Sequence, residues 1–245
     1  MNEQLCDQLR TLRLAGFIQG LQEQQENARY RELSFEERLG FLLQKECLRR
    51  DNGKLVRRLK NAHLKQAATL DQVDFTVLRG LNKKKFMELA DLAWVAQHHN
   101  LTIVGPTGVG KSFLASVIGD QACKHGFTVR YFKTSALVSE LLSAKADGSY
   151  PKFSAALART DLLLIDEWLR EPLSDCHARE ILDLLDDRFR KSSTLFATQF
   201  PVADWYRLIK EPTLAEAILD RVVHDSLRIE LKGESMRKLT SKVTQ

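Results

Sequence analysis

The sequence contains no apolar run long enough to span a membrane. Within its 245 residues no uninterrupted hydrophobic stretch approaches the roughly 18 residues that cross a bilayer, and the opening residues MNEQLCDQLR are polar. We therefore expect neither secretion nor membrane insertion, and no membrane partner.

Cysteine is scarce and shows no paired motif. The four cysteines lie far apart, form no C-x-x-C pair and have no metal-ligand spacing with the six histidines. They are Cys6, Cys47, Cys123 and Cys176. This pattern is typical of free thiols in a reducing compartment, so it predicts a cytoplasmic protein.

Internal repeats and low-complexity segments are also missing. A chain of this length holds one large domain with a modest appendage, or two small domains. Its 44% hydrophobic and 28% charged residues are typical of a soluble globular protein. The net charge of +5, with a pI near 9.0, mildly favours an anionic partner.

The most informative stretch is LTIVGPTGVGKSFL, residues 101–114, which contains the pattern G-x-x-x-x-G-K-[ST]. Glycines let backbone N–H groups approach phosphate, and the following helix directs its positive end at the same oxygens. A chance glycine-rich turn is the alternative, but an apolar strand precedes this loop and an apolar helical face follows it. The predicted nucleotide-binding residues are Gly105, Pro106, Thr107, Gly108, Val109, Gly110, Lys111, Ser112 and Phe113.

Four residues have expected roles in phosphate chemistry. Lys111 would reach the β- and γ-phosphates, and the Ser112 hydroxyl would bind Mg²⁺. The apolar run 162–165 leads directly into Asp166 and Glu167. Asp166 would hold Mg²⁺ through water, and Glu167 would orient a water molecule towards the γ-phosphate. An acidic pair at a helix N-terminus is the alternative explanation for these two carboxylates.

Strand and helix patterns alternate after the loop. Apolar strands are expected at 128–132, 162–165, 195–198 and 227–231, in addition to the strand before the loop. Such strands predict an α/β fold with a parallel sheet covered on both faces. Ligands bind beyond the carboxyl ends of parallel strands, so Thr198 and Gln199 could contact the γ-phosphate, with an ordinary strand-end turn as the alternative.

Capping signals predict where several helices begin. The signals are Ser34 with Glu37, Asn82, and Thr213 with Glu216. The corresponding helices are expected from residue 35 towards 63, over 83–98, and up to about 224. Before them, the first 21 residues fit one bent helix or two short ones.

The helix expected after Ser34 carries a basic face. Asp51 is the only acid between Arg49 and Lys65, so the i, i+4 pairs that normally balance an exposed helix are missing. A solvated face is the alternative, but this imbalance favours an anionic surface partner, and if the face is helical it could follow the phosphate backbone of double-stranded DNA. Because one amide and no aromatic accompany the cations, we expect little sequence preference. The candidate residues are Arg50, Lys54, Arg57, Arg58 and Lys65.

The motifs GPTGVGKS, LLLIDE, ATQ, AILDR and ESMRKLT, in this order, resemble those of AAA+ ATPases. Within them the chain is similar to the DnaC-like helicase loaders and to the IstB-type transposition helper proteins, the second resemblance being closer and covering nearly the whole chain. It includes the runs DEW and FATQFP. The resemblance implies an AAA+ core behind a small all-helical domain, and we place the boundary between residues 1–66 and 67–245.

This resemblance also implies an activity and partners. IstB-type proteins are the ATP-binding partners of a DDE-type transposase, bind DNA with little sequence preference and form ATP-dependent homo-oligomers. It therefore implies an Mg²⁺-dependent ATPase with ATP sites at subunit boundaries, which recruits or stimulates a transposase. A helicase loader stays open as an alternative. A small-molecule kinase would lack a visible lid and would leave Glu167, Arg221 and the basic helix unexplained.

Residue roles follow from the matching motifs. Lys111 and Ser112 match the Walker A pair, and Asp166 and Glu167 match the Walker B pair. Gln199, with Thr198 beside it, falls at the first sensor position, where many AAA+ proteins have Asn.

Further candidates come from the later part of the chain. Arg221 resembles the arginine finger that reaches a neighbouring subunit's γ-phosphate, with an ion pair to Asp220 or Asp225 as the alternative. Arg237 resembles the second sensor, although too little sequence follows residue 223 for a full helical lid. The segment 135–153 resembles the channel-facing part of helicase loaders and initiators. Its candidates for DNA contact are Lys145 and Lys152.

Overall fold

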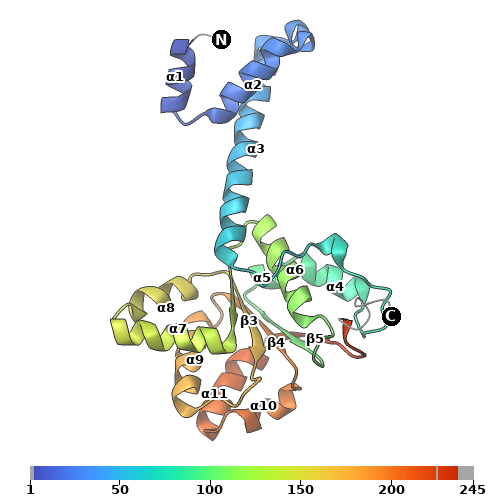
Figure 1. The fold of residues 1–245 in the computed structure, drawn as a ribbon, viewed down its shortest axis with the longest axis vertical. Coiled ribbons are helices and arrows are strands. Elements are labelled where there is room, and N and C mark those ends of the chain that lie inside the picture. The colour runs from blue at the N-terminus through green and yellow to red at the C-terminus, as the bar shows by residue number, and fades with distance from the viewer. Residues whose placement is uncertain (1–2, 225, 237–245) are drawn as a thin grey trace, which may run out of the picture. The chain divides into compact units, whose positions relative to one another are not determined.

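The computed structural model describes residues 3–224 and 226–236 (Figure 1). The chain forms two compact units, residues 1–57 and 58–245. The division falls inside the long helix α3 (Phe35–Ala62). The domain boundary that we expect after residue 66 stays a prediction. No helix in the described ranges is long and apolar enough to cross a membrane. All four cysteines are free thiols, as expected.

The first unit is helical. Of the two arrangements that the sequence allows, it has two short helices, α1 (Glu3–Thr11) and α2 (Ala15–Glu26), and a 3-10 helix η1 (Ala28–Glu32) leads towards α3. A β-carbon on Gly16 would lie 2.7 Å from the Cα atom of Glu46, so glycine is needed where α2 meets α3. The Gly16 N–H donates to Oε2 of the buried Glu46 (2.7 Å).

The long helix α3 begins where the sequence predicts and ends at Ala62, next to the expected end near residue 63. Ser34 and Glu37 form the capping box, with backbone-to-side-chain distances of 2.8 and 3.2 Å. The helix ends at Ala62 because His63 adopts a left-handed backbone with φ of 50°. Lys65 therefore lies beyond the helix, and its expected place on the basic helical face is wrong.

Two cations of the basic face have acidic partners, contrary to the expected imbalance. Arg50 Nε lies 2.6 Å from Glu46 Oε1, and Lys54 Nζ lies 2.9 Å from Asp51 Oδ1. Glu46 lies one helical turn before the segment from Arg49 to Lys65, in which the acidic residues were counted. The sequence pattern therefore did not reveal the pair of Glu46 with Arg50.

The second unit is built on five parallel strands in the order β2-β3-β4-β1-β5. The strands are β1 (Asn100–Val104), β2 (Val129–Lys133), β3 (Leu162–Trp168), β4 (Ser193–Thr198) and β5 (Ser226–Glu230). β1, β3 and β4 are almost completely buried, which explains their continuous apolar sequence. The predicted parallel sheet is confirmed.

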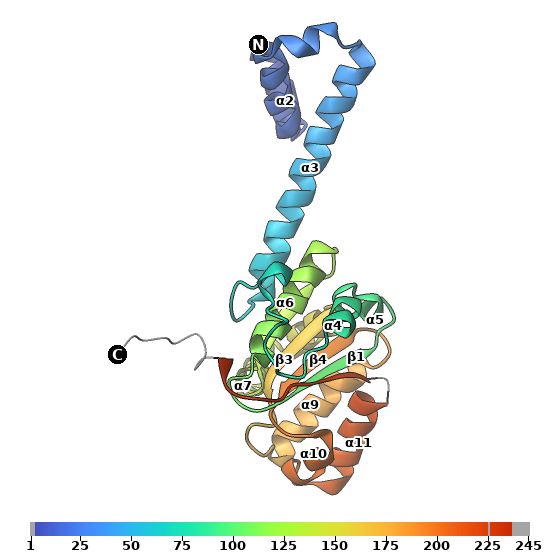
Figure 2. The same ribbon diagram turned by 90° about the vertical axis from the view of Figure 1, so that its right-hand side faces the viewer.

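Helices cover both faces of this sheet (Figure 2). They are α4 (Lys83–Ala90), α5 (Ala93–Ala96), α6 (Lys111–Lys124), α7 (Thr134–Asp147), α8 (Tyr150–Ala158), α9 (Asp175–Arg188), α10 (Val202–Leu208) and α11 (Pro212–Val223), with a 3-10 turn η2 (Leu70–Gln72). Leu163 and Ile165 of β3 join one core with residues of α7, α9 and α11. Leu164, on the opposite face of the strand, packs against Gly119 of α6.

Two predicted helix boundaries are wrong. The helix expected over 83–98 is capped by Asn82 as predicted, but it breaks after Ala90 because Leu92 is left-handed (φ 62°). The capping box expected at Thr213 does not cap α11. Glu211 accepts the N–H groups of Thr213 and Leu214 instead, at 3.2 and 2.6 Å, so α11 begins at its own proline, residue 212. Helix α10 was not predicted.

No C-terminal lid is evident in the described part of the chain, which ends at Met236. Arg237, the expected second sensor, lies outside the described residues.

Candidate nucleotide-binding site

The phosphate loop connects β1, which lies between β4 and β5 in the sheet, to the N-terminus of α6. Gly108 and Gly110 have φ values of 86° and 101°, which side chains other than glycine rarely adopt. A β-carbon on Gly105 would lie 2.7 Å from the Leu231 carbonyl oxygen. The pattern's glycines are thus needed for the conformation of the loop, which places its N–H groups at the positive end of a 14-residue helix.

Lys111 is the first residue of α6 and folds back over the loop. Its Nζ donates to the carbonyl oxygens of Gly105 (2.7 Å) and Pro106 (2.9 Å). Partial burial lowers the pKa of Lys111, although the negative charge of Asp166 opposes this effect. The ammonium group is held at the loop by two carbonyl oxygens, within reach of any phosphate that binds there.

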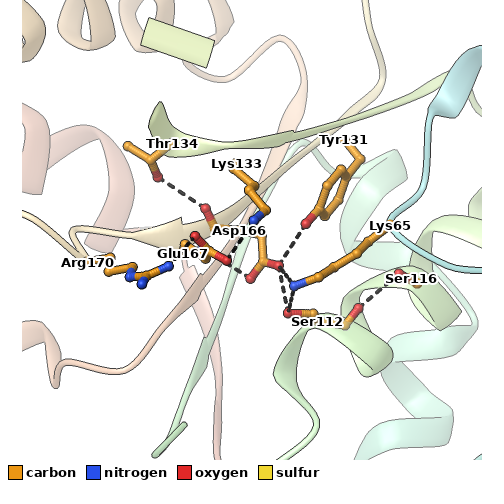
Figure 3. Close-up of polar contacts among 9 residues, drawn as sticks. All are labelled: Lys65, Ser112, Ser116, Tyr131, Lys133, Thr134, Asp166, Glu167 and Arg170. Atoms are coloured by element: carbon orange, nitrogen blue, oxygen red, sulfur yellow. Dashed lines mark hydrogen bonds and ion pairs between the residues drawn. The ribbon is translucent and has the colours of Figure 1, made fainter. Parts of the chain in front are cut away.

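Ser112 and Asp166 meet although they come from different elements. The Ser112 hydroxyl donates to Asp166 Oδ2 (2.6 Å), and so do the Tyr131 hydroxyl (2.8 Å) and Lys65 Nζ (3.1 Å) (Figure 3). Asp166 is only 3% exposed. Burial alone would raise the pKa of this carboxyl, but the three hydrogen bonds outweigh it, so the pKa is lowered and the group stays ionised.

Glu167 is turned towards a different set of partners by an irregularity in β3. The register with β4 shifts between Ile165 and Trp168, and Glu167 itself has a φ of 55°. Its carboxylate lies 3.2 Å from Lys133 Nζ and 3.0 Å from the Arg170 guanidinium. Burial would raise the pKa of Glu167, but hydrogen bonds and charge from these two cations lower it.

Thr198, the last residue of β4, and Gln199, which follows it, have different surroundings. Gln199 Oε1 accepts a hydrogen bond from the Thr107 hydroxyl (3.1 Å), so this side chain faces the phosphate loop. Thr198 is buried, and its hydroxyl donates to the Trp168 carbonyl (2.8 Å) and accepts from the Phe200 N–H (3.2 Å). Thr198 therefore joins the ends of β3 and β4, and Gln199 is the one of the pair placed to reach a ligand.

Arg221 lies at the edge of the sheet formed by the amino ends of the strands. Its carbonyl oxygen accepts from Nδ2 of Asn100, the first residue of β1, whereas the phosphate loop follows the last residue of that strand. Its guanidinium pairs with Asp186 and Asp220. The ion pair with Asp220, expected as the alternative, is therefore present, while Asp225 lies outside the described residues. Arg221 does not contact its own phosphate loop.

A pocket of about 430 Å³ adjoins the loop. One wall comes from the phosphate loop, including Lys111 and Phe113, and the other comes from residues 65–79. Arg79 in that second wall is buried, and its guanidinium donates to the carbonyl oxygens of Val109 (3.3 Å) and Asp74 (3.1 Å). Sequence reasoning missed this wall because no motif marks the segment.

The site also contains residues that the sequence pattern could have indicated. Lys133 is the last residue of β2 and lies in register with Asp166, and Tyr131 lies two residues earlier on the same strand. The rule that ligands bind beyond the carboxyl ends of parallel strands therefore applies to β2 as well as to β3 and β4.

The remaining candidates for DNA contact are distributed over several elements. Lys145 on α7 pairs with Glu180 (2.6 Å), which raises the pKa of Lys145. Lys152 on α8 is exposed. Arg58 donates to the Cys123 carbonyl (3.4 Å).

Comparisons with known proteins agree with this geometry. The family described as IstB-like ATP binding protein matches residues 7–244. A protein of Sinorhizobium fredii that is named as the insertion sequence ATP-binding protein y4pL is 40% identical to this chain, and the alignment covers 95% of each chain. The crystal structure of DnaI has a TM-score of 0.57 at 20% identity over 67% of this chain and 90% of its own. The replication initiator DnaA bound to AMPPCP and single-stranded DNA has a TM-score of 0.58 at 15% identity, over 70% and 52%. These two structures show the AAA+ fold alone, whereas the family match and the y4pL similarity show that the chain belongs to the IstB-like ATP-binding proteins.

Proposed function

We propose that the protein is an Mg²⁺-dependent ATPase that assembles on double-stranded DNA when it binds ATP and then recruits or stimulates a partner transposase. The observation that carries the ATPase part is the contact between Ser112 and Asp166 beside a phosphate loop. Hydroxyl and carboxylate oxygens are the donors that Mg²⁺ prefers. The ammonium group of Lys65, bound to the same two oxygens, supports this fit because it shows that the position accepts a cation.

The chain's own residues account for the steps of hydrolysis. Lys111 would exchange its two loop carbonyls for phosphate oxygens, and Glu167, kept ionised by its two cations, would accept a hydrogen bond from the attacking water. Bound Mg²⁺ would supply charge neutralisation of the phosphates, and it would be held directly by the Ser112 hydroxyl and through water by Asp166. Gln199 would report the γ-phosphate to the loop through Thr107.

Assembly through shared sites is supported by the position of Arg221. Because this residue lies at the amino ends of the strands, away from its own phosphate loop, its guanidinium would serve a neighbouring subunit. DNA binding is supported by the exposed cations of α3, and the transposase partner by the insertion-sequence relatives. The likeness to DnaI concerns the fold alone, so it does not favour a helicase loader.

The experiment that tests this proposal measures assembly. Purified protein is sedimented with and without duplex DNA, in the presence of ATP, ADP or no nucleotide, and a candidate transposase, sought in the neighbouring reading frame, is then added. We expect large DNA-bound assemblies with ATP alone, and retention of the transposase on them. Equal assembly with ADP and with the Lys111→Ala variant would contradict the proposal.

A further inference from the structure

Lys65 has a place in the site that neither the motif nor the proposed chemistry assigns to it. Its Nζ lies 3.0 Å from Ser112 Oγ and 3.1 Å from Asp166 Oδ2, so one ammonium group joins both expected metal ligands (Figure 3). Its side chain is 30% exposed, whereas that of Asp166 is 3% exposed. The lysine thus reaches from the surface to a buried carboxylate.

The buried carboxylate of Asp166 needs a positively charged partner when no metal ion is bound. The other side chains that donate to Asp166 Oδ2 are the neutral hydroxyls of Ser112 and Tyr131. Lys65 forms the one ion pair of Asp166 in the described part of the chain. Because a buried charge without a partner is strongly unfavourable, Lys65 compensates the charge of Asp166 here.

A metal ion and this ammonium group compete for one position. Mg²⁺ binds oxygen ligands at about 2.0–2.1 Å and carries two positive charges. An ammonium group bonded to both oxygens occupies the space that the ion would need and would repel it. Leu64, the preceding residue, packs against Gly119 of α6. The Lys65 side chain itself lines the pocket beside the loop and is 30% exposed, so it has open space into which it can rotate.

We propose that Lys65 is a tethered cation that holds the metal position between Ser112 and Asp166 until ATP and Mg²⁺ bind, and that it must leave for them to do so. This inference rests on the proposed ATPase site. It makes Lys65 a positioning residue that sets the Mg²⁺ requirement of nucleotide binding. If the lysine holds the position about nine-tenths of the time, removing it should strengthen metal-dependent binding about tenfold.

The test titrates Mg²⁺ into the full chain at a fixed concentration of a fluorescent ATP analogue. Lys65→Met should lower the half-saturating Mg²⁺ concentration about tenfold and strengthen binding in Mg²⁺ by a similar factor. In EDTA no strengthening is expected. Lys65→Arg, which keeps the charge, should retain the wild-type Mg²⁺ requirement. Lys65→Gln is a second neutral variant in case Lys65→Met does not fold.

Lys124→Met is the matched control, because Lys124 also pairs with a buried aspartate, Asp120 (2.6 Å), on α6. It should bind the analogue as the wild type does. Weaker or unchanged binding of both neutral Lys65 variants in Mg²⁺ would overturn the inference, since Lys65 would then be a phosphate ligand or a bystander. Equal strengthening in EDTA would also overturn it. A wild-type protein that binds no nucleotide would instead refute the proposed function.

Discussion

The Ser112 hydroxyl lies 2.6 Å from Asp166 Oδ2, although the two residues are 54 positions apart in the sequence. Ser112 follows β1 and Asp166 lies near the end of β3, and β4 separates these two strands in the sheet. The contact arises because all three strands are parallel and direct their carboxyl ends to one edge. The fold thus brings a hydroxyl and a carboxylate together beside a phosphate loop.

The cations around Glu167 should set the acid limb of the ATPase pH profile. Glu167 must be ionised to accept a proton or hydrogen bond from water, and Lys133 and Arg170 lower its pKa. A group with a lowered pKa stays active to lower pH, so Lys133→Met should move the acid limb to higher pH. The measurement is the hydrolysis rate between about pH 4 and 8. This range includes the titration of Glu167 in Lys133→Met, where its pKa is higher than in the wild type.

Lys191→Met is the control for this profile, because Lys191 follows α9 and lies outside the site. An acid limb that is the same in Lys133→Met and wild type would show that Glu167 does not act in its ionised form.

Arg221 should act on a neighbour's nucleotide. Arginine fingers contribute about 10³-fold or more to the rate, so Arg221→Ala should lose most activity, as should Lys111→Ala. A mixture of the two variants should recover part of the activity, because some junctions then combine an intact loop with an intact finger. Hydrolysis by the mixture, measured under conditions in which the two variants are shown to co-assemble, decides the point. A mixture as inactive as its parts would contradict the role in trans.

The basic face of α3 should bind DNA through phosphates. Replacing Lys54, Arg57 and Arg58 together by Ala should weaken binding equally on unrelated duplexes and reduce the salt slope by about 0.9 for each phosphate that is no longer neutralised. The surface pair of Lys54 with Asp51 is weak enough to exchange for phosphate. Fluorescence anisotropy at several salt concentrations measures both quantities.

The competing site is tested with the same assay. If the triple variant keeps its affinity and salt slope while Lys145→Ala or Lys152→Ala loses them, the DNA surface lies on α7 and α8. ATP binding should be preserved in all three variants.

Sequence reasoning identified the parts of the site that depend on local pattern. The glycines of the loop and the carboxylates near the end of β3 are marked by apolar runs that end beside them. Lys65 was assigned to a helix face, because nothing in the sequence shows that His63 would turn left-handed and end α3. The cap at Glu211 was missed since Ser, Thr, Asp and Asn are the usual capping residues. Such features depend on tertiary packing, which a periodic pattern does not contain.

Glu46 should make the first unit sensitive to acid. Hydrogen bonds from Arg49 lower its pKa to about 2, against the effect of burial and with further help from Arg50 and Gly16. Because the folded-state pKa is lower than the unfolded one, this stabilisation is present above about pH 4.5 and is lost as the pH falls towards 2. In the Glu46→Gln variant the amide hydrogens of α2 should therefore exchange faster at pH 7. The expected loss in the free energy of protection is about 1–3 kcal/mol.

Hydrogen exchange of α2 at pH 7 and at pH 3 checks this expectation. The difference between Glu46→Gln and wild type should shrink at the lower pH. A difference that is the same at both values would show that Glu46 contributes by packing and not by charge.

The most direct test of the account compares ATP binding and ATP turnover in Lys111→Ala and Glu167→Gln. Lys111 is placed to contact ground-state phosphate, and Glu167 to act on the attacking water, so the two losses should separate. We expect Lys111→Ala to lose ATP binding, and Glu167→Gln to bind ATP with wild-type affinity while turnover falls by about 10²-fold or more. Undiminished turnover in Glu167→Gln, or undiminished ATP binding in Lys111→Ala, would contradict the assignment of this site.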